Sequence, residues 1–80
     1  MFKVVAHNDH YTTMEFVIEV LQRFFQKTHA ESVALMLHVH RKGKAVVGVY
    51  PRDVAETRVK QTTDHARAKG YPLLLTVEPE

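Results

Sequence analysis

The pattern of hydrophobic and polar positions divides the chain into segments with different periods. Residues Phe2 to Ala6 are mostly β-branched or aromatic, and the Asn-Asp pair after them is typical of a turn, so this segment predicts a strand. From Met14 to Phe25 the apolar residues recur at helical spacing and cover about 200° of the helix, roughly twice the usual core-facing stripe. This first predicted helix therefore has more apolar surface than a core needs.

The same helix-capping signature occurs at two places. Thr12 is followed three residues later by Glu15, and Thr28 is followed in the same way by Glu31. In such a capping box the hydroxyl accepts a hydrogen bond from the backbone of the acidic residue, whose carboxylate accepts one from the backbone of the threonine. We therefore expect one helix to begin at about Thr13 and a second to begin just after Thr28.

The second predicted helix covers residues 29–42. Gly43 supplies a stop after Arg41 and Lys42, whose charges suit a helix C-terminus. The alternation in residues 34–40 would also fit a strand, but the start and stop signals and the length favour a helix. On this helix four residues share one face, namely Val33, Met36, Leu37 and His40.

The second half of the chain predicts a strand over 44–50 that Pro51 ends, a helix over 53–69 that Gly70 closes, and a last strand over 72–78. Most of the third helix should face water, because its apolar stripe is thin and consists of Ala55, Val59, Thr62 and Ala66. The order β-α-α-β-α-β predicts an α+β fold in which a three-stranded antiparallel sheet packs against three helices.

Composition and charge suggest one small domain, residues 1–80. The chain has 45% hydrophobic and 25% charged residues and no cysteine, so disulfides, thiolate catalysis and cysteine-based zinc sites are excluded. The formal charge is +2 and the basic residues are dispersed among acids, which argues against a nucleic-acid partner. No stretch approaches a membrane span, and a cytosolic location is the default expectation.

Six histidines raise the question of a metal site. On a helix His38 and His40 lie about 200° apart around the axis, so they do not share an ion. His7 and His10 could meet in the loop after the first strand, but no third ligand is near them in sequence. We expect surface or capping histidines and no metal. The single serine and the lack of a glycine-rich loop or nucleophile elbow likewise predict no enzyme activity and no cofactor.

The segment AHNDHYTTMEF concentrates polar side chains between the first strand and the first helix. Its Asn-Asp-His triplet would satisfy local backbone groups in an ordinary strand-to-helix turn. Alternatively, Asn8 and Asp9 lie at the rim of the surplus apolar surface around Met14 and Val17, which suits a ligand with a cation next to an apolar group. Met14 and Met36 would adapt such a pocket to several side-chain shapes, or would simply fill a core.

The chain closely resembles the ClpS adaptor family over essentially its whole length. The resemblance is carried, in the order of the family, by the segments NDHYTTMEFVIEVLQRFF, LMLHVHRKGKAVVGVY, DVAETRV and YPLLLTVEPE. It implies an α+β core with the element order given above. It also implies a monomeric, non-enzymatic adaptor that binds the free N-terminal residue of substrates beginning with Phe, Tyr, Trp or Leu. The adaptor hands these substrates to a Clp AAA+ unfoldase of the ClpA type and its peptidase.

The resemblance also implies roles for individual residues. Asn8 and Asp9 would bind the α-ammonium group of the substrate, assisted by His40. On the third helix Asp53 and Arg58 fall where the family contacts the N-domain of the unfoldase. Five residues would line the pocket for the first side chain of the substrate, namely Thr12, Met14, Val17, Met36 and Leu73.

Three features depart from the family pattern. The second acid after Asn-Asp is His10 here, and the loss of a carboxylate near the amine should weaken or narrow recognition, more so when the imidazole is protonated. Thr13 replaces a common proline at the first helical position, at little cost because Thr12 still caps. The sequence begins at the first strand, without the flexible segment that precedes it in the family, so we expect a trimmed chain or a short form that delivers differently.

Two other functions stay open on the sequence alone. A zinc-dependent histidine protein would bind stoichiometric metal and lose stability with a chelator. A small RNA-binding or ribosome-associated α+β domain would bind with steep salt dependence, and substitution of Asp9 would not weaken it. For Asp53 and Arg58, the alternative to an unfoldase contact is a solvated helix face with pairs such as Glu56 and Lys60.

Overall fold

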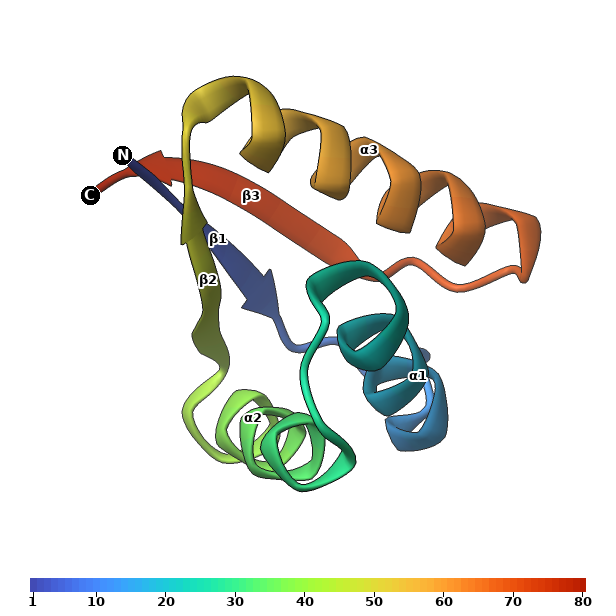
Figure 1. The fold of residues 1–80 in the computed structure, drawn as a ribbon. Coiled ribbons are helices and arrows are strands. Elements are labelled where there is room, and N and C mark those ends of the chain that lie inside the picture. Colours follow the sequence, from blue (N-terminus) through green and yellow to red (C-terminus); the bar gives the residue numbers. More distant parts are fainter.

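A computed structural model describes all residues, 1–80, as three strands and three helices (Figure 1). The element order is β-α-α-β-α-β, so the predicted α+β fold is confirmed. The elements are β1 (Phe2–His7), α1 (Met14–Phe25), α2 (His29–Lys42), β2 (Lys44–Tyr50), α3 (Arg52–Ala68) and β3 (Leu74–Pro79).

The three strands form one antiparallel sheet in the order β2-β1-β3, with β1 in the centre. Phe2 at the start of β1 lies opposite Pro79 at the end of β3. The chain termini therefore meet at one end of the sheet, where the backbone N–H of Glu80 donates to the carbonyl of Met1 at 3.3 Å (Figure 1). At the opposite end, β1 leads into the polar loop of residues 8–13.

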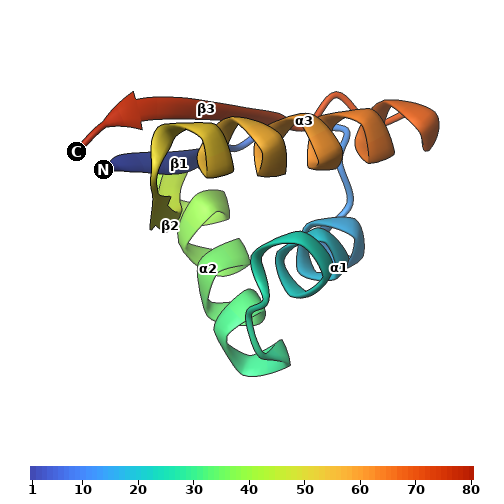
Figure 2. The same cartoon turned by 45° about the horizontal axis from the view of Figure 1, so that its top comes forward.

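All three helices pack on one face of the sheet. Figure 2 shows α1 and α2 together below the sheet, with α3 running along β1 and β3. Burial of each large apolar side chain between these layers contributes about 1.5–3 kcal/mol relative to exposure. The main core cluster joins all three strands to all three helices and consists of Val4, Ala6, Leu21, Phe25, Val39, Ala45, Val47, Ala55 and Leu75.

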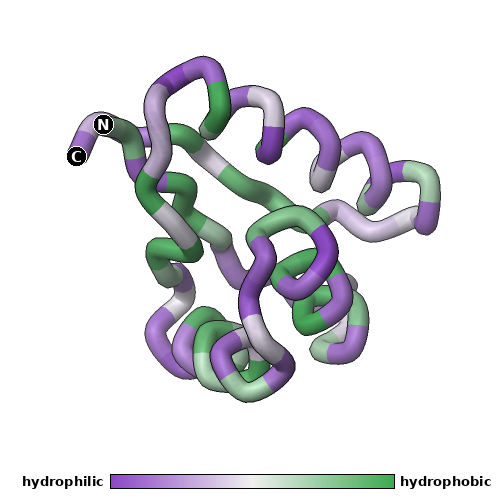
Figure 3. Tube along the Cα trace, in the orientation of Figure 1, coloured by the Kyte–Doolittle hydropathy of each residue, from purple (hydrophilic) through white to green (hydrophobic).

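The third helix buries only a narrow stripe of small residues. Ala55, Thr62 and Ala66 are fully buried, and the Thr62 hydroxyl is satisfied because it donates to the carbonyl of Arg58 at 2.8 Å. The rest of α3 is largely hydrophilic (Figure 3). This arrangement agrees with the stripe that the sequence predicts.

The ion pairs along α3 differ from the suggested pair of Glu56 and Lys60. Glu56 instead pairs with Arg52 at 3.6 Å, and Lys60 pairs with Asp64 at 3.0 Å. Glu56 therefore pairs with the residue one turn before it, and Lys60 pairs with the residue one turn after it. The suggested pair of Glu56 and Lys60 is wrong. Both pairs are exposed and contribute at most a few tenths of a kcal/mol.

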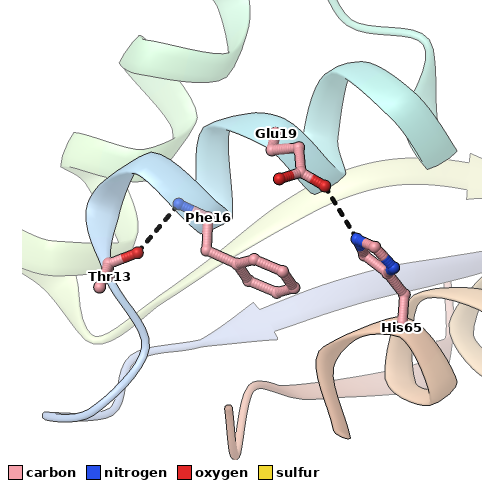
Figure 4. Close-up of polar contacts among 4 residues, drawn as sticks. All are labelled: Thr13, Phe16, Glu19 and His65. Carbon is pink, nitrogen blue, oxygen red and sulfur yellow. Dashed lines mark hydrogen bonds and ion pairs between the residues drawn. The ribbon is translucent and has the colours of Figure 1, made fainter. Parts of the chain in front are cut away.

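Two polar contacts join α3 to α1. Nε2 of His65 lies 2.8 Å from a carboxylate oxygen of Glu19, and the imidazole stacks on Phe16 with ring centroids 5.4 Å apart (Figure 4). Nη1 of Arg58 donates to the carbonyl of Phe24 at 2.7 Å. This carbonyl lies in the last turn of α1, where the helix itself provides no donor.

The second helix has the predicted bounds and the predicted capping box. The hydroxyl of Thr28 accepts from the backbone of Glu31 at 3.1 Å, and the Glu31 carboxylate accepts from the backbone of Thr28 at 2.8 Å. Gly43 ends the helix with φ at 91°, a left-handed conformation that favours glycine. The buried residues of α2 are Ser32, Met36 and Val39. Of the four residues predicted to share one face, Met36 is buried, Val33 and Leu37 are half-buried and His40 is exposed.

Candidate ligand-binding site

The loop between β1 and α1 is organised by one carboxylate. Oδ1 of Asp9 accepts hydrogen bonds from the backbone N–H groups of Tyr11 at 2.8 Å and Thr12 at 2.7 Å. Oδ2 accepts a third bond from the Thr12 hydroxyl at 2.8 Å. The backbone N–H of Asn8 donates to the carbonyl of Gly43 at 2.8 Å, which ties the loop to the end of α2.

These contacts also set the charge of Asp9. Partial burial raises the pKa of its carboxyl group, but four opposing effects outweigh burial. They are the hydrogen bonds from the backbone and hydroxyl of Thr12, the hydrogen bond from the backbone of Tyr11, and the positive charge of His10 when protonated. The pKa of Asp9 therefore lies below its ordinary value, and the carboxylate is ionised at neutral pH.

The start of α1 differs from the prediction. Thr13, and not Thr12, caps the helix, because its hydroxyl accepts from the backbone N–H of Phe16 at 3.1 Å (Figure 4). Glu15 makes no return bond, so the predicted capping box is wrong, as is the placement of Thr13 at the first helical position. Thr12 is instead held in the loop, because its backbone N–H and its hydroxyl both donate to the Asp9 carboxylate.

A cavity of about 620 Å³ opens between this loop, α1 and α2. Its apolar wall consists of Met14 and Val17 from α1 and Met36 and Val39 from α2. Met14 is 45% exposed, so a ligand would cover apolar surface that now faces water. The remaining residues form a polar rim that consists of Asn8, Asp9, His10, Tyr11, Thr12, Thr13, Glu15 and His40.

The structure brings together most of the residues that the sequence identifies as a site. One cavity is lined by Asn8, Asp9, His10, Thr12, Met14, Val17, Met36 and His40. Leu73 is not among the lining residues. It is 2% exposed and belongs to a second core cluster with Phe16 and Ala66, against which the cavity residue Val17 packs.

Four lining residues were not predicted, namely Tyr11, Thr13, Glu15 and Val39. Helical spacing could have identified Val39, which lies three residues after Met36 and so faces the same way. Nothing in the sequence marks Tyr11, whose side chain is 79% exposed at the rim.

Other surface depressions suit an apolar ligand less. Asp53 and Arg58 share a shallow depression of about 310 Å³ on α3, in which Asp53 is exposed and Arg58 is half-buried. A depression of about 560 Å³ on the outer face of α1 has Ile18 as its single hydrophobic residue. None of the three helices has the length and apolar character that crossing a membrane requires.

The histidines are spread over the molecule. Nε2 of His7 lies 2.8 Å from the hydroxyl of Thr76 on β3, whereas His10 lines the cavity. On α2, His38 and His40 lie at different depressions. The structure contains no group of three His, Asp or Glu side chains that could hold a metal ion.

Comparison with known proteins gives consistent matches. Residues 1–76 match the family described as "ATP-dependent Clp protease adaptor protein ClpS". An ATP-dependent Clp protease adapter protein ClpS from Deinococcus radiodurans is 51% identical over 80 residues, which are all of this chain and 71% of that protein. A relative of the same name from Desulfatibacillum aliphaticivorans is 52% identical over 80 residues, all of this chain and 77% of the relative.

A solved structure is also similar. It is Agrobacterium tumefaciens ClpS2 bound to L-phenylalaninamide, which matches with a TM-score of 0.96 and 44% sequence identity. The match covers 99% of this chain and 95% of that one. The likeness therefore includes every strand and helix that surrounds the cavity.

Proposed function

The chain belongs to the ClpS family of ATP-dependent Clp protease adaptor proteins, and we propose that its cavity binds the free N-terminal residue of proteins that begin with Phe, Tyr, Trp or Leu. Proteins held in this way would be delivered to a Clp AAA+ unfoldase for degradation. The observation that carries the proposal is the position of an ionised carboxylate, Asp9, on the rim of an apolar cavity.

A free α-ammonium group suits the polar rim. A carboxylate offers about four acceptor positions, and the loop uses three of those on Asp9, so one on Oδ2 remains for a ligand. The amide oxygen of Asn8 and a ring nitrogen of His40 are further acceptors on the rim. One charge-assisted hydrogen bond contributes about 1.5–3 kcal/mol, and acetylation of the amine would remove both the charge and donor hydrogens.

A large hydrophobic first side chain suits the apolar wall. Burial of a Phe or Leu side chain contributes about 1.5–3 kcal/mol, which is comparable to the ammonium contact. Met14 and Met36 have unbranched side chains that adapt to aromatic and aliphatic ligands. A β-branched first residue would crowd the entrance, and a short or charged one would lose the burial energy. The similarity to ClpS2, whose structure contains L-phenylalaninamide, supports the binding of a large hydrophobic first residue.

The proposed role is binding without catalysis, by a monomer in the cytoplasm, with the N-domain of a ClpA-type unfoldase as the partner. Asp53 and Arg58 are the residues proposed to contact that domain. Arg58 also donates to the carbonyl of Phe24, so its substitution would disturb the packing of α3 on α1. Asp53→Ala is the cleaner test, because Asp53 is exposed. It should weaken binding to the isolated N-domain in calorimetry and lower the unfolding temperature only slightly, because an acidic side chain in the first turn of a helix is mildly stabilising.

The test of the proposed function is fluorescence anisotropy with three labelled peptides. One begins with Phe, the second is the same peptide with an acetylated N-terminus, and the third begins with Val. We expect micromolar or tighter binding of the free Phe peptide alone, because the other two lack the ammonium group or crowd the entrance. Equal binding of all three peptides, or binding of none, would contradict the proposal.

A further inference from the structure

His10 is an ionisable side chain on the rim of the cavity to which the proposed function gives no task. It directly follows Asp9, is exposed, and lines the same cavity as His40. The imidazoles that form hydrogen bonds within the chain are those of His7 and His65. The ring of His10 is therefore able to gain a proton without the loss of an internal contact.

Few other groups in the cavity change charge near neutral pH. The ionisable groups that line it are Asp9, His10 and Tyr11 from the loop, Glu15 from α1 and His40 from α2. Between about pH 5 and pH 7, carboxyl groups are mostly ionised and phenols are neutral, whereas imidazoles exchange their protons. The lowered pKa of Asp9 keeps this carboxylate anionic over the whole range. The charge of the rim in this range is thus decided by its histidines.

We propose that His10 makes the capture of N-terminal residues pH-dependent, because its protonated imidazole next to the Asp9 carboxylate competes with the α-ammonium group of the ligand. The cavity then binds a free N-terminus most tightly when His10 is neutral, and releases it as the pH falls through the range in which imidazoles titrate. The inference rests on the proposed function, since it concerns the same ammonium group.

The sign of the effect follows from the charges around the ligand. A neutral His10 leaves Asp9 as the nearest charge in the loop, and this charge attracts the ammonium. A protonated His10 cancels part of that attraction. A unit charge near the ligand in a partly solvated site should weaken binding about three- to tenfold. Protonation of His40 acts in the same direction, because it removes the lone pair that would accept from the ammonium.

The experiment measures the Kd of a peptide with a free N-terminal Phe from about pH 5 to about pH 7. The peptide carries a pH-insensitive dye at its C-terminal end, and its α-amino group stays mostly charged over this range. The variants are His10→Asn, which stays neutral, and His10→Asp, which adds an anion to the rim. His38→Asn is the matched control, because His38 is an exposed histidine on α2 outside the cavity. Circular dichroism at both ends of the pH range checks that each variant is folded.

The parent and His38→Asn should lose affinity together as the pH falls. The loss in His10→Asn should be about three- to tenfold smaller, and His10→Asp should bind most tightly at the acidic end. Superimposable curves for the parent and His10→Asn would overturn the inference and leave the proposed function intact. A parent protein that fails to bind the Phe peptide at neutral pH would overturn both.

Discussion

The two helices of the first half begin with different hydrogen-bond networks, although both starts place a threonine three residues before a glutamate. At α2, the side chains of Thr28 and Glu31 each accept a hydrogen bond from the backbone of the other residue and make no hydrogen bond to any other residue. At α1, Thr12 donates to Asp9 and the neighbouring Thr13 caps the helix. The start of α2 stabilises a helix, whereas the start of α1 also builds the wall of a cavity. A capping motif in the sequence therefore predicts the cap only where other local hydrogen bonds do not hold the threonine outside the helix.

The carboxylates at the two helix starts differ in the causes of their lowered pKa values. Asp9 and Glu31 are the carboxyl groups whose pKa clearly lies below the ordinary value. For Glu31 the main cause is the backbone hydrogen bond of Thr28, and the side chain is exposed. For Asp9 partial burial raises the pKa, and the hydrogen bonds of the loop more than offset it. Of these two carboxylates, only Asp9 lies beside the apolar wall of the cavity.

The largest expected effect on affinity and stability comes from removal of the Asp9 carboxylate before α1. Asp9→Ala removes three hydrogen bonds and the charge on the rim. Affinity for a free N-terminal Phe should fall by about a hundredfold or more, and the free energy of unfolding by about 2 kcal/mol. Peptide titration and urea unfolding measure these two losses.

Asp9→Asn separates the two roles of this residue. The amide oxygen still accepts from the backbone of the loop, so most of the stability should return, whereas the ammonium contact should not. Asp64→Ala, which removes an exposed carboxylate on α3, is the control for a general charge effect. Unchanged peptide affinity in Asp9→Ala would rule out the assigned ammonium contact.

The two caps should contribute similar amounts of stability. Thr13→Ala and Thr28→Ala should each lower the free energy of unfolding by about 1 kcal/mol, because each leaves a backbone N–H of the first turn without its acceptor. Serine at either position should restore most of the loss, since it keeps the hydroxyl. Urea unfolding of the four variants tests the assignment, and an unaffected Thr13→Ala variant would show that this residue does not cap α1.

Replacement of Thr12 by valine should affect stability about as much as the loss of either cap. Thr12→Val keeps the shape of the side chain and removes the hydroxyl that donates to Asp9, so the loss should be about 0.5–1.5 kcal/mol. The pKa of Asp9 should rise toward its ordinary value, because one hydrogen bond to the charged form is lost. The pKa of Glu31 should not move. Carbon-detected NMR titration of the carboxyl groups follows both residues in one experiment.

The smallest expected effect is the pH dependence that Glu31 contributes. Its folded pKa is lowered, so its contribution to stability is complete above the pKa of the unfolded chain and is lost as the pH falls through the folded pKa. Glu31→Gln should therefore lose less stability than the parent between about pH 5 and pH 3. Urea unfolding at the two pH values measures the difference. An equal loss in parent and variant would mean that the carboxylate does not support the start of α2.

The element order could be predicted because its signals are local. Gly43 and Pro51 lie at element boundaries, and the helical and strand periods differ over short stretches. The central position of β1 is not a local property, since it depends on the pairing of residues as distant as Phe2 and Pro79. Sequence patterns therefore identify the strands more readily than their order in the sheet.

For the site, too, local sequence patterns identify nearby residues more readily than contacts between distant elements. Its polar rim is predictable because most of it comes from consecutive residues of one loop, with His40 added by the family resemblance. The packing of Leu73 against Phe16 depends on how α3 and β3 meet α1, which no local pattern encodes. Thr13 rather than Thr12 caps α1, and Thr12 is held in the loop by hydrogen bonds to Asp9 that the capping pattern alone does not indicate.

The meeting of Met1 and Glu80 at one end of the sheet has a mechanical consequence. Because β1 and β3 are antiparallel neighbours with their free ends together, a force that pulls these ends apart acts across their hydrogen bonds. The bonds would then fail one after another, starting at the pair of Phe2 and Pro79, and the strands would unzip at low force. The pair of His7 and Leu74, next to the ligand-binding loop, would separate last.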